Sequence, residues 1–294
     1  MALIAFLLLA PPMFVAGPLA GLLLLSRPTT RREWGWLLGA TVWSLVWLQQ
    51  PGGLAAQFTR AGAVLLCGTF LALTLWRPSG RFSRALTATA ITGGALLVWM
   101  LHLGLTWPQV RKSVADDLTG SYRLLQTQWS AAPSARELLS QMAAMSDTVA
   151  ALYPALLGLA CIGGIRLAWV WNHRIARRPV GPPPTPFRAF TFSDHLVWGW
   201  VMALGLVLFR TPEPLRLVGQ NLLLVWAVLY ASRGLAIASA VWGPVPAPVF
   251  TVLGIIALFL LPFVLGGLTL LGLADTWLDF RRRLTTPTTG GYHV

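Results

Sequence analysis

Long apolar runs separated by short polar gaps dominate this chain of 294 residues. Eight such runs can be traced, at residues 2–25, 34–48, 54–76, 85–106, 149–171, 194–209, 215–242 and 249–273. Several reach the roughly eighteen residues that mark a membrane-crossing helix, and they are too long and continuous for the strands of a membrane barrel. Because lipid accepts only helices or closed barrels, the pattern predicts an all-α fold. We expect a polytopic integral membrane helical bundle of about eight transmembrane segments, within a range of roughly seven to nine.

Proline and glycine interrupt the first and the last of these runs. Pro11, Pro12 and Pro18 fall within the first run and predict a kink or a break into two short pieces. Pro262 and the glycine pair at 266–267 lie near the middle of the last run. They predict two half-helices or a re-entrant pair, since broken helices are tolerated where protein or water covers the backbone.

The composition agrees with a membrane protein and argues against binding of nucleic acid. Charged residues make up 11% of the chain, against about 25% in soluble domains, and 56% of the residues are hydrophobic. The net charge of +13 comes largely from arginines in the gaps between apolar runs, where they indicate topology and contact with lipid headgroups. The two cysteines lie inside apolar runs, which excludes a disulfide framework and a four-ligand metal site.

A proline-rich cytoplasmic linker at residues 179–191 is predicted to join two membrane halves, residues 1–178 and 192–283, and a flexible tail follows at 284–294. The N-terminal half contains one long polar segment at 107–147, which we expect to lie outside the membrane. Five apolar residues in this segment recur at helical spacing and predict one face of an amphipathic helix: Val110, Val114, Leu118, Leu125 and Trp129.

The distribution of arginine predicts the topology. The loops at 27–32, 77–84 and 172–191 are rich in arginine, whereas the charges of the 107–147 segment balance. The positive-inside rule then puts these three loops in the cytoplasm and the N-terminus outside. Eight crossings would leave the tail outside, although three arginines at 281–283 favour the inside, so one crossing is miscounted. The miscounted run is the proline-rich first run, the short sixth run or the last run broken at Pro262. We favour the last run, as two half-helices or a re-entrant pair.

The seventh run carries polar residues that are costly in lipid. Gln220 and Asn221 lie near its start, and Arg233 lies deep in its apolar part, where insertion costs roughly 2.5–3.5 kcal/mol. Asn221, Ser232 and Ser239 share one helical face and either line a site or form hydrogen bonds between helices. Arg233 either contacts an anion or substrate, or snorkels or packs against a helix end. Gln220, Asn221 and Arg233 are therefore candidate ligand-binding residues.

Two aspartates complete the candidate ligand-binding set. Asp194 opens the sixth run directly after Ser193, and either side chain is suited to cap a helix there. Asp275 lies four residues before Asp279 at the end of the last run. This end is either a solvated helix terminus at headgroup level, in which Asp279 pairs with the arginines that follow it, or part of a binding site.

Motifs for catalysis and nucleotide binding do not occur in the sequence. It contains no HExxH, Walker A, GxSxG or CxxC motif, and its four histidines are scattered. We therefore expect a protein that is not an enzyme and that has no cofactor and no metal site. An energised uptake module would need a separate ATPase partner.

Several short motifs stand out in the C-terminal half: Phe192-x-Asp194 before Trp198, Gly219-Gln220-Asn221-Leu222, Leu229-Tyr230, Arg233-Gly234-Leu235-Ala236 and Leu271-Gly272-Leu273-Ala274-Asp275-x-Trp277-x-Asp279-Phe280-Arg281. In these motifs the chain resembles the YybS-like family of uncharacterised bacterial multi-pass membrane proteins. The resemblance covers roughly the last 100 residues, and the N-terminal half is similar only in hydrophobic layout. Arg233 stands where the family pattern has a glutamine. The resemblance implies a multi-pass protein of the bacterial cytoplasmic membrane and supplies no mechanism.

Two hypotheses about function follow from these residues. The first is a non-catalytic component that binds or transports a small solute or lipid between its two halves, with the seventh and eighth runs lining the site. The second is a scaffold or assembly partner that engages a protein through residues 107–147 and membrane lipids through its basic cytoplasmic loops.

Overall fold

The computed structural model describes residues 13–76, 78, 82–128, 137, 140–141, 144–241, 249, 254, 257, 259–278 and 280. Every regular element in these ranges is a helix. Among the residues that the structure describes, five helices are long and apolar enough to cross a membrane: α4 (Leu54–Trp76), α5 (Phe82–His102), α9 (Tyr153–Ile175), α11 (Glu213–Val241) and α13 (Leu261–Leu278). Two shorter apolar segments, Phe14–Leu25 and Asp194–Leu208, add to them. The prediction of an all-helical membrane protein is confirmed for the described residues. The count of about eight crossings is not confirmed, because the predicted run at 34–48 forms the helix Arg31–Gln49, which is not among these seven segments.

Contacts divide the chain into two compact units, with the boundary between Pro184 and Thr185. We call them the N-terminal unit and the C-terminal unit. The boundary falls inside the proline-rich stretch, which carries no long helix.

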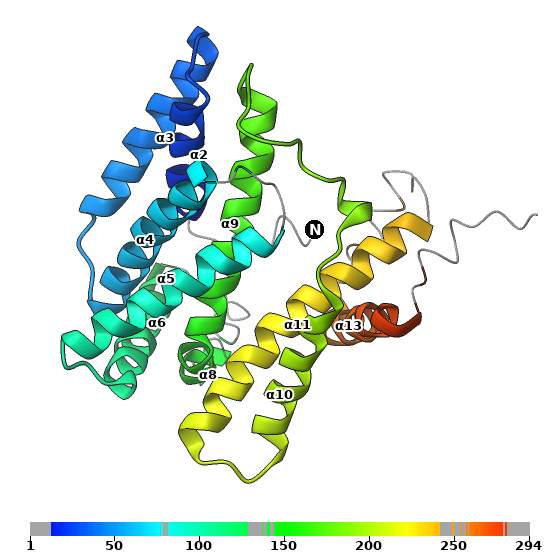
Figure 1. The fold of residues 1–294 in the computed structure, drawn as a ribbon. Helices are drawn as coiled ribbons and strands as arrows, with labels where there is room; N and C mark the ends of the chain where they lie inside the picture. The colour runs from blue at the N-terminus through cyan, green and yellow to red at the C-terminus, as the bar shows by residue number, and fades with distance from the viewer. Residues whose placement is uncertain are drawn as a thin grey trace, which may run out of the picture. The chain divides into compact units, whose positions relative to one another are not determined.

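The N-terminal unit is built around the short helix α2 (Met13–Leu25), which packs against α4, α9 and α3 (Arg31–Gln49) (Figure 1). Phe14, Leu22 and Leu23 of α2 are fully buried. A side chain at Gly164 of α9 would collide with the carbonyl of Phe14, so the two backbones are in direct contact. The helix begins at Met13 and contains Pro18. The predicted break at the preceding proline pair lies outside the described residues.

Helix α6 (Trp107–Gln128) confirms the predicted amphipathic helix over its first three turns. Val110 and Val114 are buried, and Val114 packs with Ala55 at the start of α4 and with Ala150 of α8 (Ser146–Ala151). The apolar face of α6 is therefore covered by its own chain. The side chain of Leu125, and Trp129, lie outside the described residues.

A capping box at the start of α3 joins this helix to α9. One Glu33 carboxylate oxygen accepts hydrogen bonds from the backbone N–H groups of Thr29 and Thr30, at 2.9 and 2.8 Å, and from the Thr30 hydroxyl at 2.9 Å. The other accepts the backbone N–H of Arg177, just after α9, at 2.6 Å. The N–H of Arg177, followed by the groups of Thr30 and Thr29, lowers the pKa of Glu33 from 4.5 to about 2.

This lowered pKa predicts an acid-sensitive N-terminal unit. A carboxyl whose pKa falls on folding stabilises the fold fully above its unfolded pKa, and the contribution disappears as the pH falls through its folded pKa. We therefore expect the stability that Glu33 contributes to be lost between pH 4.5 and about 2. Thermal unfolding midpoints of the wild type and of Glu33→Gln, measured in detergent across this window, should converge toward the acid end. Parallel pH profiles for the two proteins would contradict this role of Glu33.

In the C-terminal unit, α11 is the longest helix and packs against both α10 (Val197–Leu208) and α13. Gly219 of α11 lies against Leu206 of α10, where an added Cβ would come within 2.7 Å of the Leu206 Cβ. On α13, Pro262 is the second helical residue, a position where its missing N–H costs nothing. The described positions 249, 254, 257 and 259 are also helical, and a turn at Leu260 separates them from α13. The predicted break of the last run at Pro262 is therefore consistent with the structure, whereas the glycine pair at 266–267 lies inside α13 and does not break it.

Helices α11 and α13 approach to backbone contact at two glycines. A Cβ at Gly234 would collide with the carbonyl of Leu268, and a Cβ at Gly272 would collide with the carbonyl of Tyr230. Such close contact of two helices needs small residues at the crossing, as is common in membrane bundles.

Gly234→Ala and Gly272→Ala should each destabilise the C-terminal unit by about 1–3 kcal/mol, because the new methyl group forces two backbones apart. The free energy of unfolding in a detergent titration measures the effect. Gly266→Ala and Gly267→Ala in the same helix are matched controls, since their Cβ atoms would meet nothing within 4 Å. These controls should be neutral or stabilising by up to about 1 kcal/mol. Equal effects at all four glycines would refute the proposed close crossing.

Candidate functional site

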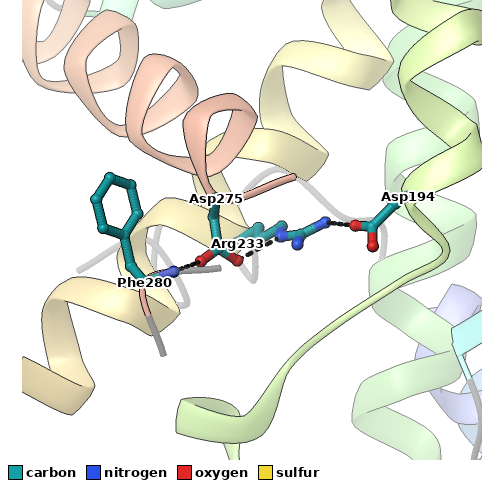
Figure 2. A network of polar contacts seen from close by, with 4 residues as sticks. All are labelled: Asp194, Arg233, Asp275 and Phe280. Atoms are coloured by element: carbon teal, nitrogen blue, oxygen red, sulfur yellow. Dashed lines mark hydrogen bonds and ion pairs between the residues drawn. The ribbon is translucent and has the colours of Figure 1, made fainter. Parts of the chain in front are cut away.

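Three charged side chains of the C-terminal unit meet at Arg233 of α11. Its Nη1 donates to a carboxylate oxygen of Asp194 at 2.7 Å, and its Nε donates to Asp275 of α13 at 2.9 Å. Asp194 belongs to a 3₁₀ turn, η2 (Asp194–Leu196), that leads directly into α10. Figure 2 shows the guanidinium lying between the two carboxylates, which come from opposite sides. We call these three residues the ion triad.

Burial separates the two arms of the ion triad. The side chains of Arg233 and Asp275 are 6% and 3% exposed, whereas that of Asp194 is 62% exposed. The second oxygen of Asp275 accepts the backbone N–H of Phe280 at 3.1 Å, so both oxygens of the buried carboxylate have donors. The arm to Asp275 is therefore a buried pair, and the arm to Asp194 opens to the surroundings.

Aromatic rings enclose the guanidinium. Its central carbon lies 5.4 Å from the ring centroid of Phe192, within the range of a cation–π contact. Tyr230, one turn before Arg233 and fully buried, packs edge-on against Phe192 and against Trp200 of α10. Because both partners of the buried arm are shielded from solvent, their electrostatic attraction is stronger than in water.

The glycine crossing explains why Asp275 reaches Arg233. Gly234 follows Arg233 directly, and Gly272 lies one turn before Asp275 on α13. Aspartate has a short side chain, so it can bond an arginine on the next helix only where the two backbones are close. The crossing of α11 and α13 at Gly234 and Gly272 provides that closeness.

Three interpretations from the sequence change with this geometry. The helix start at Ser193 has no side-chain capping hydrogen bond, and Asp194 bonds Arg233 instead. The interpretation of Asp275 as a solvated helix end is wrong, because this carboxylate is buried. Arg233 is buried with two carboxylate partners, so it does not snorkel. The predicted pairing of Asp279 with the arginines after it lies outside the described residues.

Gln220 and Asn221 lie elsewhere on α11. They are twelve or more residues before Arg233, roughly 18 Å along the helix axis. The amide of Asn221 donates to the carbonyl of Leu217 in its own helix, and Gln220 is exposed. The hydroxyls of Ser232 and Ser239 likewise donate to carbonyls of α11. The structure therefore brings together Asp194, Arg233 and Asp275, and it leaves the amide pair apart.

Sequence reasoning missed the partnership of the three charges and the aromatic residues around them. The available signal was charge balance: an arginine deep in an apolar helix needs an acidic partner. Asp194 and Asp275 were two such candidates in the C-terminal half, each at the edge of a neighbouring apolar run.

The ion triad is suited to attract a cationic group. One guanidinium and two ionised carboxylates sum to one negative charge, and the exposed carboxylate of Asp194 is where that charge meets the surroundings. Within the described ranges, no group of three or more His, Cys, Asp or Glu residues is placed to hold a metal ion.

Comparison with protein families matches residues 1–276 to a family model described as Predicted membrane protein (DUF2232). The match includes the N-terminal half, which contains none of the motifs of the YybS-like resemblance. Searches of curated proteins and of solved structures found no match to this chain.

The two arms of the ion triad predict unequal effects of mutation. Asp275→Asn leaves a buried guanidinium poorly compensated and should destabilise the protein by about 3 kcal/mol or more. Asp194→Asn removes the exposed partner and should cost less than about 1 kcal/mol. Unfolding free energies in a detergent titration provide the comparison.

The double variant Arg233→Leu with Asp275→Leu is the control for a purely electrostatic loss. It should be more stable than Asp275→Asn, because an apolar pair leaves no unpaired buried charge. If the double variant were the least stable of the three, the account of a costly buried charge would fail.

Proposed function

Because the chain belongs to the DUF2232 family of predicted membrane proteins, we propose that it is a non-catalytic membrane component that binds a small solute or a lipid. The observation that carries this proposal is the ion triad, buried among apolar helices with one carboxylate exposed. The binding place would be the open side of the ion triad at Asp194.

The buried arm of the ion triad favours a binding role on energetic grounds. Replacing a buried ion pair with apolar residues of similar volume is often neutral or stabilising, so the pair is weak evidence of a purely structural role. Charged residues in membrane segments are rare and commonly mark pathways or binding sites. Arg233 and Asp275 are such residues, and the exposed Asp194 connects them to the surroundings.

The ligand chemistry follows from the charge sum. The negative balance at Asp194 favours a solute or lipid that carries an amine or another cationic group. Phe192, whose ring lies beside the guanidinium, would offer an apolar contact next to that charge. An anionic ligand would be repelled, so direct capture of an anion by Arg233 is not part of this proposal.

We extend the proposal to the topology of the C-terminal unit. Asp194 precedes α10 and Asp275 lies near the end of α13, and both bind one side chain. The start of α10 and the end of α13 would then face the same side of the membrane. If the basic loop at 172–191 is cytoplasmic, as the positive-inside rule predicts, the arginines after α13 are cytoplasmic as well. A cytoplasmic C-terminal tail would agree with the arginines at 281–283 and not with the count of eight crossings, which had placed the tail outside.

Native mass spectrometry of the purified protein in mild detergent tests the binding proposal. We expect a co-purified small molecule or lipid with a cationic group, retained by the wild type and lost or reduced at least about tenfold in Asp194→Asn, since one charge-assisted contact contributes about 1.5–3 kcal/mol. Asp194 is exposed, so this variant should keep the fold.

The control for this test is Glu213→Gln, which also removes one exposed carboxylate but lies at the start of α11, far from Arg233. It should retain the ligand. A wild-type protein without any bound molecule under conditions that preserve lipids, or equal loss in both variants, would refute the proposed site.

We keep a scaffold role as the second candidate, with weaker support. The first three turns of α6 use their apolar face inside the N-terminal unit, so a partner there would have to bind the polar face. We further propose that the protein resides in the bacterial cytoplasmic membrane and that, within its family, it belongs to the YybS-like proteins. An ATPase partner would be needed only for energised uptake.

A further inference from the structure

A second charged feature lies in the N-terminal unit, at the end where α2 and α9 finish and α3 begins. The loop that joins α2 to α3 and the end of α9 lie at the same end of this unit (Figure 1). Six arginines in these two segments have exposed side chains: Arg27, Arg31, Arg32, Arg174, Arg177 and Arg178. We call them the arginine patch.

Two long-range hydrogen bonds bring the halves of the arginine patch together. The carboxylate of Glu33 accepts the backbone N–H of Arg177, across 144 residues of sequence. The hydroxyl of Ser26 donates to the buried side chain of Asn172, across 146 residues. These bonds fix the loop with three arginines against the helix end with the other three.

The arginine patch keeps its positive charge. Glu33 is the only acidic residue in these two segments, and its carboxylate is buried and bonded to backbone N–H groups and threonine hydroxyls. None of the six guanidiniums pairs with a carboxylate in the described part of the chain. The acid therefore organises the arginines without neutralising them.

Arg27 occupies a backbone conformation that normally selects glycine. Its φ of 54° lies in the left-handed region, at the turn that ends α2. Glycine adopts this conformation without strain, whereas an arginine is strained there. Strained residues of this kind cluster at functional sites.

Tryptophans mark this end of the unit as the level of lipid headgroups. Trp34 and Trp36, at the start of α3, are 47% and 44% exposed. Trp36 packs edge-on against Trp171 near the end of α9, with ring centroids 6.1 Å apart. Exposed tryptophans gather at the boundary between lipid and water, so the adjacent arginines lie within reach of lipid phosphates.

We propose that the arginine patch is one binding site for the phosphate-bearing headgroup of an anionic lipid, with Glu33 holding its two halves in register. Arginine suits this ligand because its planar fork of N–H donors matches phosphate oxygens in bidentate geometry. Two clusters of three arginines suit a headgroup with two phosphates, such as cardiolipin, better than one with a single phosphate. This site lies in a different unit from the ion triad and does not depend on the function proposed for it.

The test measures cardiolipin binding to the full-length protein in mild detergent by native mass spectrometry. We expect saturable binding of cardiolipin, weaker binding of phosphatidylglycerol and none of phosphatidylcholine. Each arginine replaced by glutamine should weaken binding about fivefold, because a basic residue near an anionic lipid contributes on the order of a fivefold change in affinity. Inorganic phosphate that bound as tightly as cardiolipin would overturn the assignment to a lipid.

Glu33→Gln distinguishes a built site from general attraction of a basic surface. The substitution removes a negative charge, so general attraction predicts tighter binding of cardiolipin. The proposal predicts weaker binding, because the two halves of the arginine patch separate. Tighter or unchanged binding by this variant would overturn it.

Arg27→Gly controls for loss of the fold. Because glycine relieves the strained conformation, this variant should keep or raise the thermal midpoint while it binds cardiolipin about fivefold more weakly. The matched charge control replaces Arg111, Lys112 and Arg123 with glutamine. These residues are on α6, which packs at the start of α4, and they should leave binding unchanged. An equal loss in this control would show general attraction and refute the site.

Discussion

A guanidinium inside an apolar helix has to be neutralised where it lies, and the C-terminal unit is arranged around that requirement. Arg233 cannot reach water from its buried position, so carboxylates come to it from the segment before α10 and from the end of α13. The approach of α13 depends in turn on Gly234 and Gly272, which allow backbone contact. The interhelical contact and the buried charge therefore support each other.

The buried charge and the exposed charge have opposite signs in the two units. In the C-terminal unit a buried cation is over-compensated, and the remaining negative charge lies on the exposed Asp194. In the N-terminal unit a buried anion, Glu33, is satisfied by N–H and hydroxyl groups, and uncompensated arginines remain at the surface. In both units the buried residue organises a site and an exposed residue carries its net charge.

Packing in the N-terminal unit illustrates a limit of hydrophobic patterns in membrane proteins. Leu22 and Leu23 of α2 are fully buried, whereas Leu24 is 57% exposed. Lipid tails are as apolar as leucine, so hydrophobicity does not distinguish a residue that faces protein from one that faces lipid. Direct backbone contact at Gly164 does make that distinction, because a larger residue would not fit there. The apolar sequence of α2 therefore did not indicate that this helix packs against three others.

The sequence by itself determined the features that depend on local order along the chain. These include the helical class, most helix bounds, the amphipathic face of α6 and the arginine-rich loops. It also indicated Arg233, because a charge in an apolar run is conspicuous without any structure. Helix α4 shows how far this extends, since its bounds coincide with the apolar run from Leu54 to Trp76.

Only the tertiary structure decided which side chains meet. Asp194 and Asp275 are 39 and 42 residues from Arg233, and Glu33 is 144 residues from Arg177. Periodicity describes neighbours one or two turns apart, whereas these partnerships depend on which helices cross and how closely. For that reason the sequence named Asp194, Arg233 and Asp275 as separate candidate residues without joining them, and it gave no role to Glu33. The same reason explains why the sequence did not show that the apolar face of the first three turns of α6 is covered by the chain itself.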